Sequence, residues 1–284
     1  MEDKAALKKL EDALTEYYGW AMHAGTREKI AAAIQRKAAR LHVPTDQYCV
    51  LAASSSSELL SLVEEIAVSD TFFFREPGQY EFLRTTVLPE LFEKHSATQT
   101  VSRDNRLRLW SAACSTGEEA FSLAITCHQV NAKADPSNVE VFATDVRNRA
   151  LLEASRAKYK LPALRACDVE LRAKYFENYY NPPEAPLDSR YTVISNVRRL
   201  VIFRRANLMD GTFWKGAANR FELILCANVP MYLHSAALRQ MVERLSRSLR
   251  EGGYLMVAPA ETSLIEHARL KRIHACEGFF QKQA

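Results

Sequence analysis

Two adjacent carboxylates, Glu118 and Glu119, follow a run of small residues in the segment SAACSTGEEAFSLA (111–124). Small residues let the backbone approach a ligand closely, here between an expected strand and an expected helix. A dinucleotide site would show GxGxxG, with a pyrophosphate at the helix N-terminus. The segment has one glycine, and two carboxylates would repel a pyrophosphate. A cationic ligand without phosphate, such as S-adenosylmethionine, fits better. The alternative is that acidic residues merely favour the first turn of a helix.

Residues that could contact a ligand also lie at the ends of three later strand-like stretches. They are Asp145 after VEVFAT (139–144), Asn207 and Leu208 in VIFRRANL (201–208), and Asn228 and Tyr232 in and after FELILCANV (221–229). Ligands of doubly wound sheets bind at the carboxyl ends of the strands. Asp145 could therefore accept the ribose hydroxyls of an adenosine, or simply cap a helix. Asn207 and Leu208 could contact an adenine ring.

Three consecutive phenylalanines precede Arg75 in VSDTFFFREPGQYEFL (68–83). An arginine held on an aromatic floor beside the site could grip a carboxylate with its forked guanidinium. The alternative is a buried aromatic linker with an arginine on the surface.

The elements that must position these residues alternate between strands and helices. Strands are expected at 107–112, 139–144, 201–208, 221–229 and 254–259, and helices include 118–130 and 235–250, the second ended by Gly252-Gly253. This order predicts an α/β fold with a parallel sheet and helices on both faces. Residues 1–66 are expected to be helical. The stretch at about 162–200 predicts a small β insertion, with antiparallel strands around a Ser195-Asn196 turn.

The composition is that of an ordinary globular protein, with 48% hydrophobic and 25% charged residues among 284. A net charge of +4 is too small to indicate a nucleic-acid binder. The six cysteines and seven histidines show no metal-ligand spacing, so no metal site is expected. The charged N-terminus is unlike a secretory signal. The longest apolar stretch is too short to span a bilayer. We therefore expect a cytoplasmic monomer.

One expected helix, at about 26–41, has a strongly basic polar face. Its cations are Arg27, Lys29, Arg36, Lys37 and Arg40. They predict either a docking surface for an acidic partner or a merely solvated helix face.

Four motifs together resemble the CheR-type chemotaxis receptor glutamate O-methyltransferases, over roughly residues 60–260. They are TFFFRE (71–76), WSAACSTGEEAFSLA (110–124), FATDV (142–146) and FELILCANVPMYL (221–233). The resemblance implies a helical domain at 1–66 and a class I, Rossmann-like methyltransferase domain at 67–284 that contains the β insertion. It also implies methyl transfer from S-adenosylmethionine to glutamates in the acidic cytoplasmic helices of methyl-accepting receptors. The products would be glutamyl methyl esters and S-adenosylhomocysteine.

The resemblance also assigns site residues. Cofactor binding is expected at Ser69, Thr71, Arg75, Ala112, Glu118, Asp145, Asn207, Leu208, Cys226, Ala227 and Asn228. Arg75 and Tyr232 are expected closest to the chemistry, and the basic helix would dock the receptor.

Three stretches depart from the family pattern. In the motif that is usually CRNVxIYF, Ala227 replaces the arginine and Pro230 is added. APAE (258–261) replaces GHSE, and Ser69 replaces a common asparagine. They leave open a cofactor-binding regulatory module with weak or no catalysis. A methyltransferase with another substrate is a further alternative. For that class, NPPE (181–184) is only superficially similar to the [DN]PP[YF] motif, because it lacks the aromatic residue and lies in the insertion.

Overall fold

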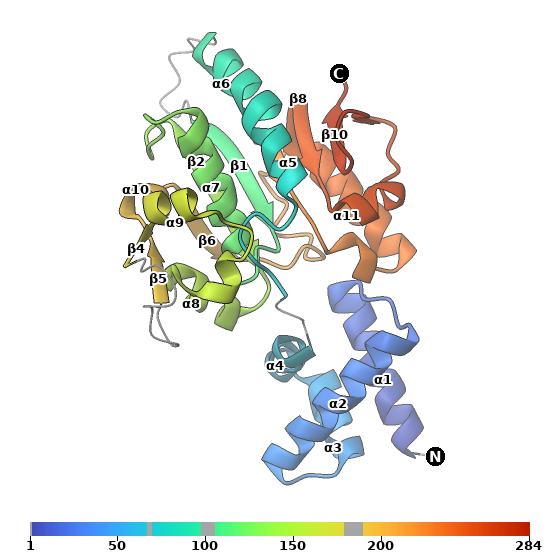
Figure 1. Ribbon diagram of the computed structural model, residues 1–284. Helices are drawn as coiled ribbons and strands as arrows, with labels where there is room; N and C mark the ends of the chain where they lie inside the picture. Colours follow the sequence, from blue (N-terminus) through green and yellow to red (C-terminus); the bar gives the residue numbers. More distant parts are fainter. Residues whose placement is uncertain (1, 67–69, 98–105, 179–189) are drawn as a thin grey trace.

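A computed structural model describes residues 2–66, 70–97, 106–178 and 190–284. Its N-terminal part is helical (Figure 1), with α1 (Glu2–Tyr18), α2 (Ala24–Leu41), α3 (Thr45–Ser54) and α4 (Ser56–Ile66). These helices share a core of their own, in which Leu10, Leu14 and Leu62 are fully buried. The predicted N-terminal helices are confirmed, while the domain division at 66/67 stays a prediction.

A second group of elements forms one large sheet with the strand order β6-β2-β1-β7-β8-β10-β9. The strands are β1 (Leu107–Ala112), β2 (Val139–Asp145), β6 (Val201–Arg205), β7 (Phe221–Leu225), β8 (Leu249–Met256), β9 (Leu270–Arg272) and β10 (Phe279–Lys282). Strands β6, β2, β1, β7 and β8 are parallel, whereas β10 is antiparallel to β8 and to β9. The α/β methyltransferase-type sheet is confirmed, with two strands that the sequence pattern did not predict.

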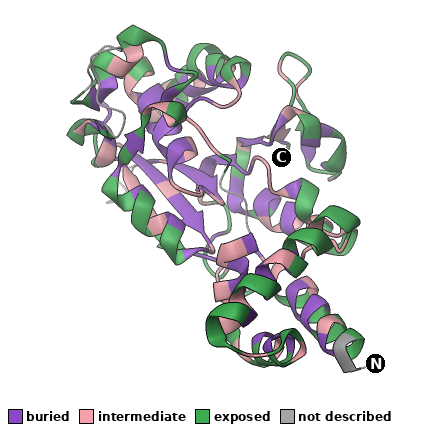
Figure 2. Cartoon of the chain, turned by 60° about the horizontal axis from the view of Figure 1, so that its bottom comes forward, coloured by how far each residue is buried: buried purple, intermediate pink, exposed green. Residues whose placement is uncertain are grey.

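Alternate residues of the central strands face opposite sides of the sheet, as strand geometry requires. Leu109 and Leu223 pack toward α7 (Glu118–Val130) and α6 (Leu88–Ala97), whereas Trp110 and Ile224 pack toward α11 (Ser235–Ser248). Figure 2 shows that buried residues are concentrated in the sheet and on the helix faces against it. Both faces are covered, so the carboxyl edge of the strands is left to form a site.

The residues of a smaller sheet come between helix α8 (Asn148–Arg156) and strand β6 in the sequence. It has the order β3-β5-β4 and is antiparallel throughout. Its elements are β3 (Lys158–Lys160), η2 (Leu161–Leu164), α9 (Val169–Tyr175), β4 (Phe176–Glu177) and β5 (Arg190–Val193). The small antiparallel insertion is thus confirmed, and it begins at Lys158, slightly before the predicted start.

The predicted pair of antiparallel strands around Ser195-Asn196 is wrong. Residues Ser195–Arg198 form the short helix α10, which buries Val197. The following strand β6 pairs in parallel with β2, with Val201 opposite Val141. The apolar run after the turn is indeed a strand, but its partner lies about 60 residues earlier rather than next to it in sequence.

Gly252 and Gly253 do not end the helix before them, as the sequence suggested. Helix α11 ends at Ser248, and both glycines lie inside β8, where the pairing with β7 shifts register. A Cβ atom at Gly253 would lie 3.0 Å from the carbonyl oxygen of Glu222, so this irregular part of the ladder needs a residue without a side chain.

The segment that links the two parts enters α5 (Pro77–Phe82), continues through a π-helical turn (Leu83–Val87) and leads into α6. Phe73 and Phe74, just before α5, are buried in the same core as α7. Phe73 packs edge-to-face on Tyr159 and Phe176 of the small sheet. This aromatic anchor fixes the backbone that carries the neighbouring Arg75.

Candidate active site

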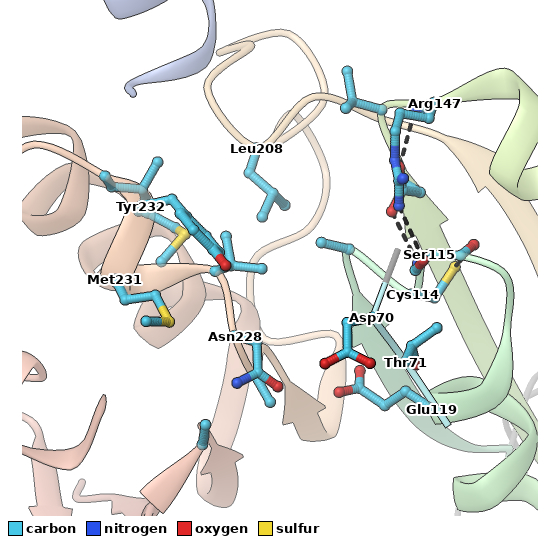
Figure 3. Close-up of a pocket in the computed structure, with 18 of the residues that line it drawn as sticks. Asp70, Thr71, Cys114, Ser115, Glu119, Arg147, Leu208, Asn228, Met231 and Tyr232 are labelled. Atoms are coloured by element: carbon cyan, nitrogen blue, oxygen red, sulfur yellow. Dashed lines mark hydrogen bonds and ion pairs between the residues drawn. The ribbon is translucent and has the colours of Figure 1, made fainter. Parts of the chain in front are cut away.

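A cavity of about 670 Å³ lies at the carboxyl ends of the parallel strands, between them and the N-terminal helices. Its size is in the range of small-molecule sites. Figure 3 shows Asn228, Met231 and Tyr232 on one side and Thr71, Ser115 and Glu119 on the other. The predicted site residues that line it are Lys29, Thr71, Arg75, Asp145, Asn207, Leu208, Ala227, Asn228 and Tyr232.

Three of the predicted cofactor-binding residues are described by the structure but are not among the residues that line the cavity. Ala112 and Cys226 are fully buried at the ends of their strands, and Glu118 is 5% exposed behind the wall. Ser69 lies outside the described residues, as does the NPPE segment. Other residues line the cavity that the sequence did not single out, among them Trp20, Asp70 and Arg147.

The loop after β1 is tightly wound, because Ala113, Ser115 and Gly117 all have positive φ angles. The amide of Ser115 donates to Asp145 at 2.9 Å, and the amide of Cys114 donates to the carbonyl oxygen of Thr144 at 2.8 Å. These bonds tie the ends of β1 and β2 together. As predicted, small residues let this backbone form the cavity floor.

The two carboxylates that begin α7 have different surroundings. Glu119 lines the cavity and accepts a 2.6 Å hydrogen bond from Ser111, whereas Glu118 accepts one of 2.6 Å from Thr116 behind the wall. Burial raises the pKa of each carboxyl group to about 7. The carboxylate that lines the cavity is therefore Glu119, one position after the one expected, while the role of Glu118 in binding the cofactor stays a prediction.

Asp145 forms a buried ion pair with Arg147, with Nε 3.1 Å from Oδ1. The carboxylate also accepts the backbone amides of Ser115 and Arg147, both at 2.9 Å. The Arg147 guanidinium in turn donates to the Ser115 hydroxyl at 2.9 Å (Figure 3). A carboxylate offers about four acceptor positions, so Asp145 has room for roughly one further hydroxyl. The predicted contact with an adenosine ribose therefore stays a prediction, now with one ribose hydroxyl rather than two.

Arg75 reaches the cavity from the linking segment and is 34% exposed. One guanidinium nitrogen donates to the carbonyl oxygen of Asp70, and the other lies 4.0 Å from the Asp70 carboxylate. Arg165, which follows the short helix η2 of the insertion, also approaches that carboxylate, at 3.5 Å, and stacks on Phe72 at 3.4 Å from the ring centroid. Asp70 therefore lies between two arginines, and Arg75 keeps its exposed face toward the cavity.

Asn207 connects the site to the N-terminal helices. Its side-chain amide donates to the carbonyl oxygen of Tyr17 at 2.6 Å, while its Oδ1 accepts from the amide of Met209 at 2.9 Å. The amide group predicted to read an adenine is thus engaged within the chain. Leu208, which points toward the cavity in Figure 3, offers an apolar contact there.

The loop after β7 carries Ala227, Asn228 and Tyr232 into the cavity. Asn228 has a φ of 61°, and Tyr232 is 41% exposed at the end of the short helix η3 (Pro230–Tyr232). Glu261, the last residue of APAE, is fully buried and accepts the amides of Asn228 at 2.8 Å and Met231 at 3.1 Å. No local pattern in the sequence indicates this contact.

Four of the five basic residues of α2 are already paired. Arg27 contacts Glu11 at 2.8 Å, Arg36 and Arg40 contact Glu65 at 3.4 and 2.9 Å, and Lys37 contacts Glu58 at 2.8 Å. Lys29 is exposed and lines the cavity, and no described residue forms an ion pair with it. The basic face is therefore weaker than its composition suggests, and its one cavity-facing cation is Lys29.

Over the described ranges, no group of histidine, cysteine, aspartate or glutamate side chains has the arrangement of a metal site. Across the same part of the chain, every helix falls short of the length and apolarity that crossing a membrane would require.

The cavity fits a cationic adenosyl ligand. Glu119 offers a carboxylate that suits a cationic group, and Asp145 has room for a hydroxyl. Leu208 and Val229 offer apolar surface. In the loop after β1, the amides of Cys114, Ser115 and Gly117 already have acceptors within the chain.

The comparisons with known proteins agree with this site. Residues 69–278 match the family model described as "CheR methyltransferase, SAM binding domain". A chemotaxis protein methyltransferase of Borreliella burgdorferi is 28% identical over 216 residues, which are 74% of this chain and 70% of that protein. A probable chemotaxis protein methyltransferase of Rhizobium etli is 29% identical over 76% of both chains. The probable biofilm formation methyltransferase WspC of Pseudomonas aeruginosa is 29% identical over 80% of this chain but 50% of its own length.

The matched region contains the whole large sheet up to β9 and every strand end that contributes to the cavity. The chain belongs to the CheR family of S-adenosylmethionine-dependent methyltransferases.

Proposed function

We propose that this methyltransferase forms glutamyl methyl esters on the cytoplasmic helices of methyl-accepting chemotaxis receptors. The observation that carries the proposal is the cavity in which Arg75 and Tyr232 line the same space as Glu119 and Asp145. Carboxylates suit a cationic cofactor, and an arginine suits an anionic substrate. A carboxylate substrate would therefore meet its complementary charge at Arg75.

S-adenosylmethionine, when bound, supplies an electrophilic methyl group on a sulfonium that leaves as a neutral thioether. Glu119 would hold the ammonium end, Asp145 a ribose hydroxyl, and Thr71, Leu208, Ala227 and Asn228 the remaining wall. The buried residues Ala112, Glu118 and Cys226 would support that wall from behind.

The protein needs no strong base for this reaction. A glutamate side chain has a pKa of about 4.3, so at pH 7 it is already the nucleophilic carboxylate. Arg75 would bind one carboxylate oxygen and leave the other free to attack, and the Tyr232 hydroxyl would border the transfer site. Catalysis is then mainly a matter of orientation, which can contribute several kcal/mol.

Receptor docking would use the cavity rim. Lys29 extends the positive charge of Arg75 toward α2, where an acidic helix would lie. The paired cations Arg27, Arg36, Lys37 and Arg40 would add a weaker, partly neutralised field. The proposed setting is a cytoplasmic monomer that neither binds nucleic acid nor inserts into a membrane.

The experiment is transfer of labelled methyl from S-adenosylmethionine to receptor-containing membranes of the same cells, followed by mild alkali. We expect label that alkali releases as methanol, because carboxyl methyl esters hydrolyse under these conditions. The matched control is the Arg75→Ala variant, which should incorporate little label. Label that survives alkali would indicate N- or C-methylation and contradict the proposal.

The two alternatives from the sequence are outcomes of the same experiment. Cofactor binding without incorporation into any receptor would favour a regulatory module, as Ala227 and APAE (258–261) suggest. Incorporation into another class of molecule would favour a different substrate.

A further inference from the structure

Glu261 is a buried carboxylate, and burial removes the water that would otherwise stabilise its charge. It is 0% exposed, and burial raises its pKa, which the surrounding backbone amides and Arg75 oppose. Among the described residues no lysine or arginine forms an ion pair with it. A buried carboxylate without a direct countercharge is retained only when hydrogen bonds satisfy it.

Three backbone amides satisfy this carboxylate, and they come from two segments. Oε2 accepts from Asn228 at 2.8 Å and from Ala258 at 3.2 Å, while Oε1 accepts from Met231 at 3.1 Å. The contact with Ala258 caps the short helix η4 (Pro259–Leu264), in which Glu261 is the third residue. The other two contacts reach across to the loop after β7, about 30 residues earlier.

Other backbone bonds hold the two ends of that loop, where the amide of Cys226 donates to the carbonyl oxygen of Met256 at 2.8 Å and the carbonyl oxygen of Tyr232 accepts from Ala21 at 2.8 Å, so the bonds to Glu261 act on its middle. Ala227 has no side chain beyond Cβ, Pro230 has no amide hydrogen, and Asn228 has a left-handed backbone, which costs free energy for a residue with a side chain. The bonds to Glu261 hold the strained residue Asn228 itself and, beyond Pro230, Met231. They fix the backbone from Asn228 to Met231, and Tyr232 follows directly.

We propose that Glu261 is a positioning residue for the methyl-transfer site, which orders the loop carrying Ala227, Asn228 and Tyr232 by accepting its backbone amides. Glu261 itself is not among the residues that line the cavity. It acts through the loop and touches neither substrate. The inference rests on the proposed function only where Tyr232 is taken to border the transferred methyl group.

The test variant is Glu261→Gln, in which the amide nitrogen cannot accept and one of the two loop amides loses its partner. We expect the affinity for S-adenosylhomocysteine, measured by calorimetry, to fall about tenfold, as for loss of a hydrogen bond to a charged group. The matched control is Glu222→Gln. Glu222 is another buried carboxylate that accepts a backbone amide (Arg108, 2.8 Å), at the opposite end of β7. Both variants should lower the melting temperature, but only Glu261→Gln should change the affinity.

Amide hydrogen exchange supplies a second readout that also serves if the variant does not fold. In the wild type, the amides of Asn228 and Met231 should exchange slowly, and in Glu261→Gln they should exchange faster. The Ser115 amide, which Asp145 holds, should be unchanged. Fast exchange of Asn228 and Met231 in the wild type would overturn the proposal, as would an unchanged affinity in a folded Glu261→Gln variant. Neither measurement needs a receptor, so failure of the glutamate substrate would leave this test intact.

Discussion

Trp20 and Leu233 pair as an isolated antiparallel β-bridge between the end of α1 and the loop that carries Tyr232. The amide of Ala21 donates to the carbonyl oxygen of Tyr232 at 2.8 Å, and the amide of His234 donates to that of Gly19 at 2.9 Å. The N-terminal helices are thus hydrogen-bonded to the backbone of a proposed active-site residue. The docking proposed for these helices would therefore be physically linked to the position of Tyr232.

Arg75→Ala should keep the fold and lose most methyl transfer. Arg75 is partly exposed and lies outside the aromatic anchor of Phe73 and Phe74, so its truncation removes little packing. We expect kcat/KM for the receptor to fall by about 10²–10³, as for loss of one preorganised charged donor. Arg84→Ala, which removes an exposed arginine paired with Glu81 outside the cavity, is the control. Near-wild-type turnover in Arg75→Ala would refute the role.

Affinity for S-adenosylmethionine should rise with pH between about 5.5 and 8. The pKa of Glu119 is about 7 because the group is buried, and a bound cation favours its ionised form. Below this pKa the ligand must displace a proton, which weakens binding. In Glu119→Gln the affinity should be low and should no longer depend on pH in this range, which isothermal calorimetry at several pH values can measure. A profile unchanged by this substitution would mean that the ammonium lies elsewhere.

Glu118 predicts an effect on stability rather than on binding. Its folded pKa of about 7 exceeds the ordinary value of 4.5, so between these values the folded state holds more protons than the unfolded state. Stability from this group is present below about pH 4.5 and is lost as pH rises toward 7. The change in melting temperature that Glu118→Gln causes, relative to the wild type, should therefore be more positive at pH 8 than at pH 5. An equal change at both pH values would contradict the assignment.

Gly117→Ala should be strongly destabilising. Gly117 has a φ of 96°, and an added Cβ would lie 2.9 Å from both the Ala154 Cβ and the Tyr159 hydroxyl. We expect a loss of about 2–4 kcal/mol in urea unfolding, since strain and overlap add. Gly216→Ala is the control, because it shares a positive φ of 81° but has open space around it. It should cost only about 1 kcal/mol. Equal losses would show that overlap is unimportant at Gly117.

Lys29→Glu should weaken receptor methylation at low salt and leave cofactor affinity unchanged. Lys29 is exposed at the cavity rim, and the substitution reverses the charge at the place where the acidic helix is proposed to lie. We expect KM for the receptor to rise several-fold, with the difference shrinking as salt screens the charges. Lys8→Glu makes the same change on α1, outside the cavity lining. If both variants behave alike, only net charge matters and the docking surface is refuted.

Much of the large sheet could be predicted because its central strands are buried on both faces. FELIL (221–225) is buried throughout and apolar at every position except Glu222 for that reason, and the strand-end rule then places Asp145, Asn207 and Asn228 at one edge. Strand β9 was missed because only Leu270 of its three residues is buried. The error at Ser195 arose because a strand's partner is chosen by tertiary packing, which a local turn pattern does not record.

At the start of α7, the residue that lines the cavity was predicted to within one position, because the rotation of the helix determines which of two adjacent side chains faces the cavity. Glu118 and Glu119 are adjacent on α7, so their side chains point about 100° apart, and composition alone does not show which one faces the cavity. The pairing of Arg27 with Glu11 and of Arg36 with Glu65 joins different helices, so a basic face that looked free is partly neutralised. Glu261 escaped notice because its role depends on amides about 30 residues away.

Val146 immediately follows Asp145 in the sheet, yet it packs into the core of the N-terminal helices and also lines the cavity. The core of the N-terminal helices therefore reaches the residue that follows β2, beside the proposed ribose contact. Truncation at residue 66 would not give a minimal catalytic fragment, because it would bare Val146 to water and remove Trp20 and Lys29 from the cavity wall. A chimera that borrows these helices from a relative would have to carry the surface that covers Val146 with them.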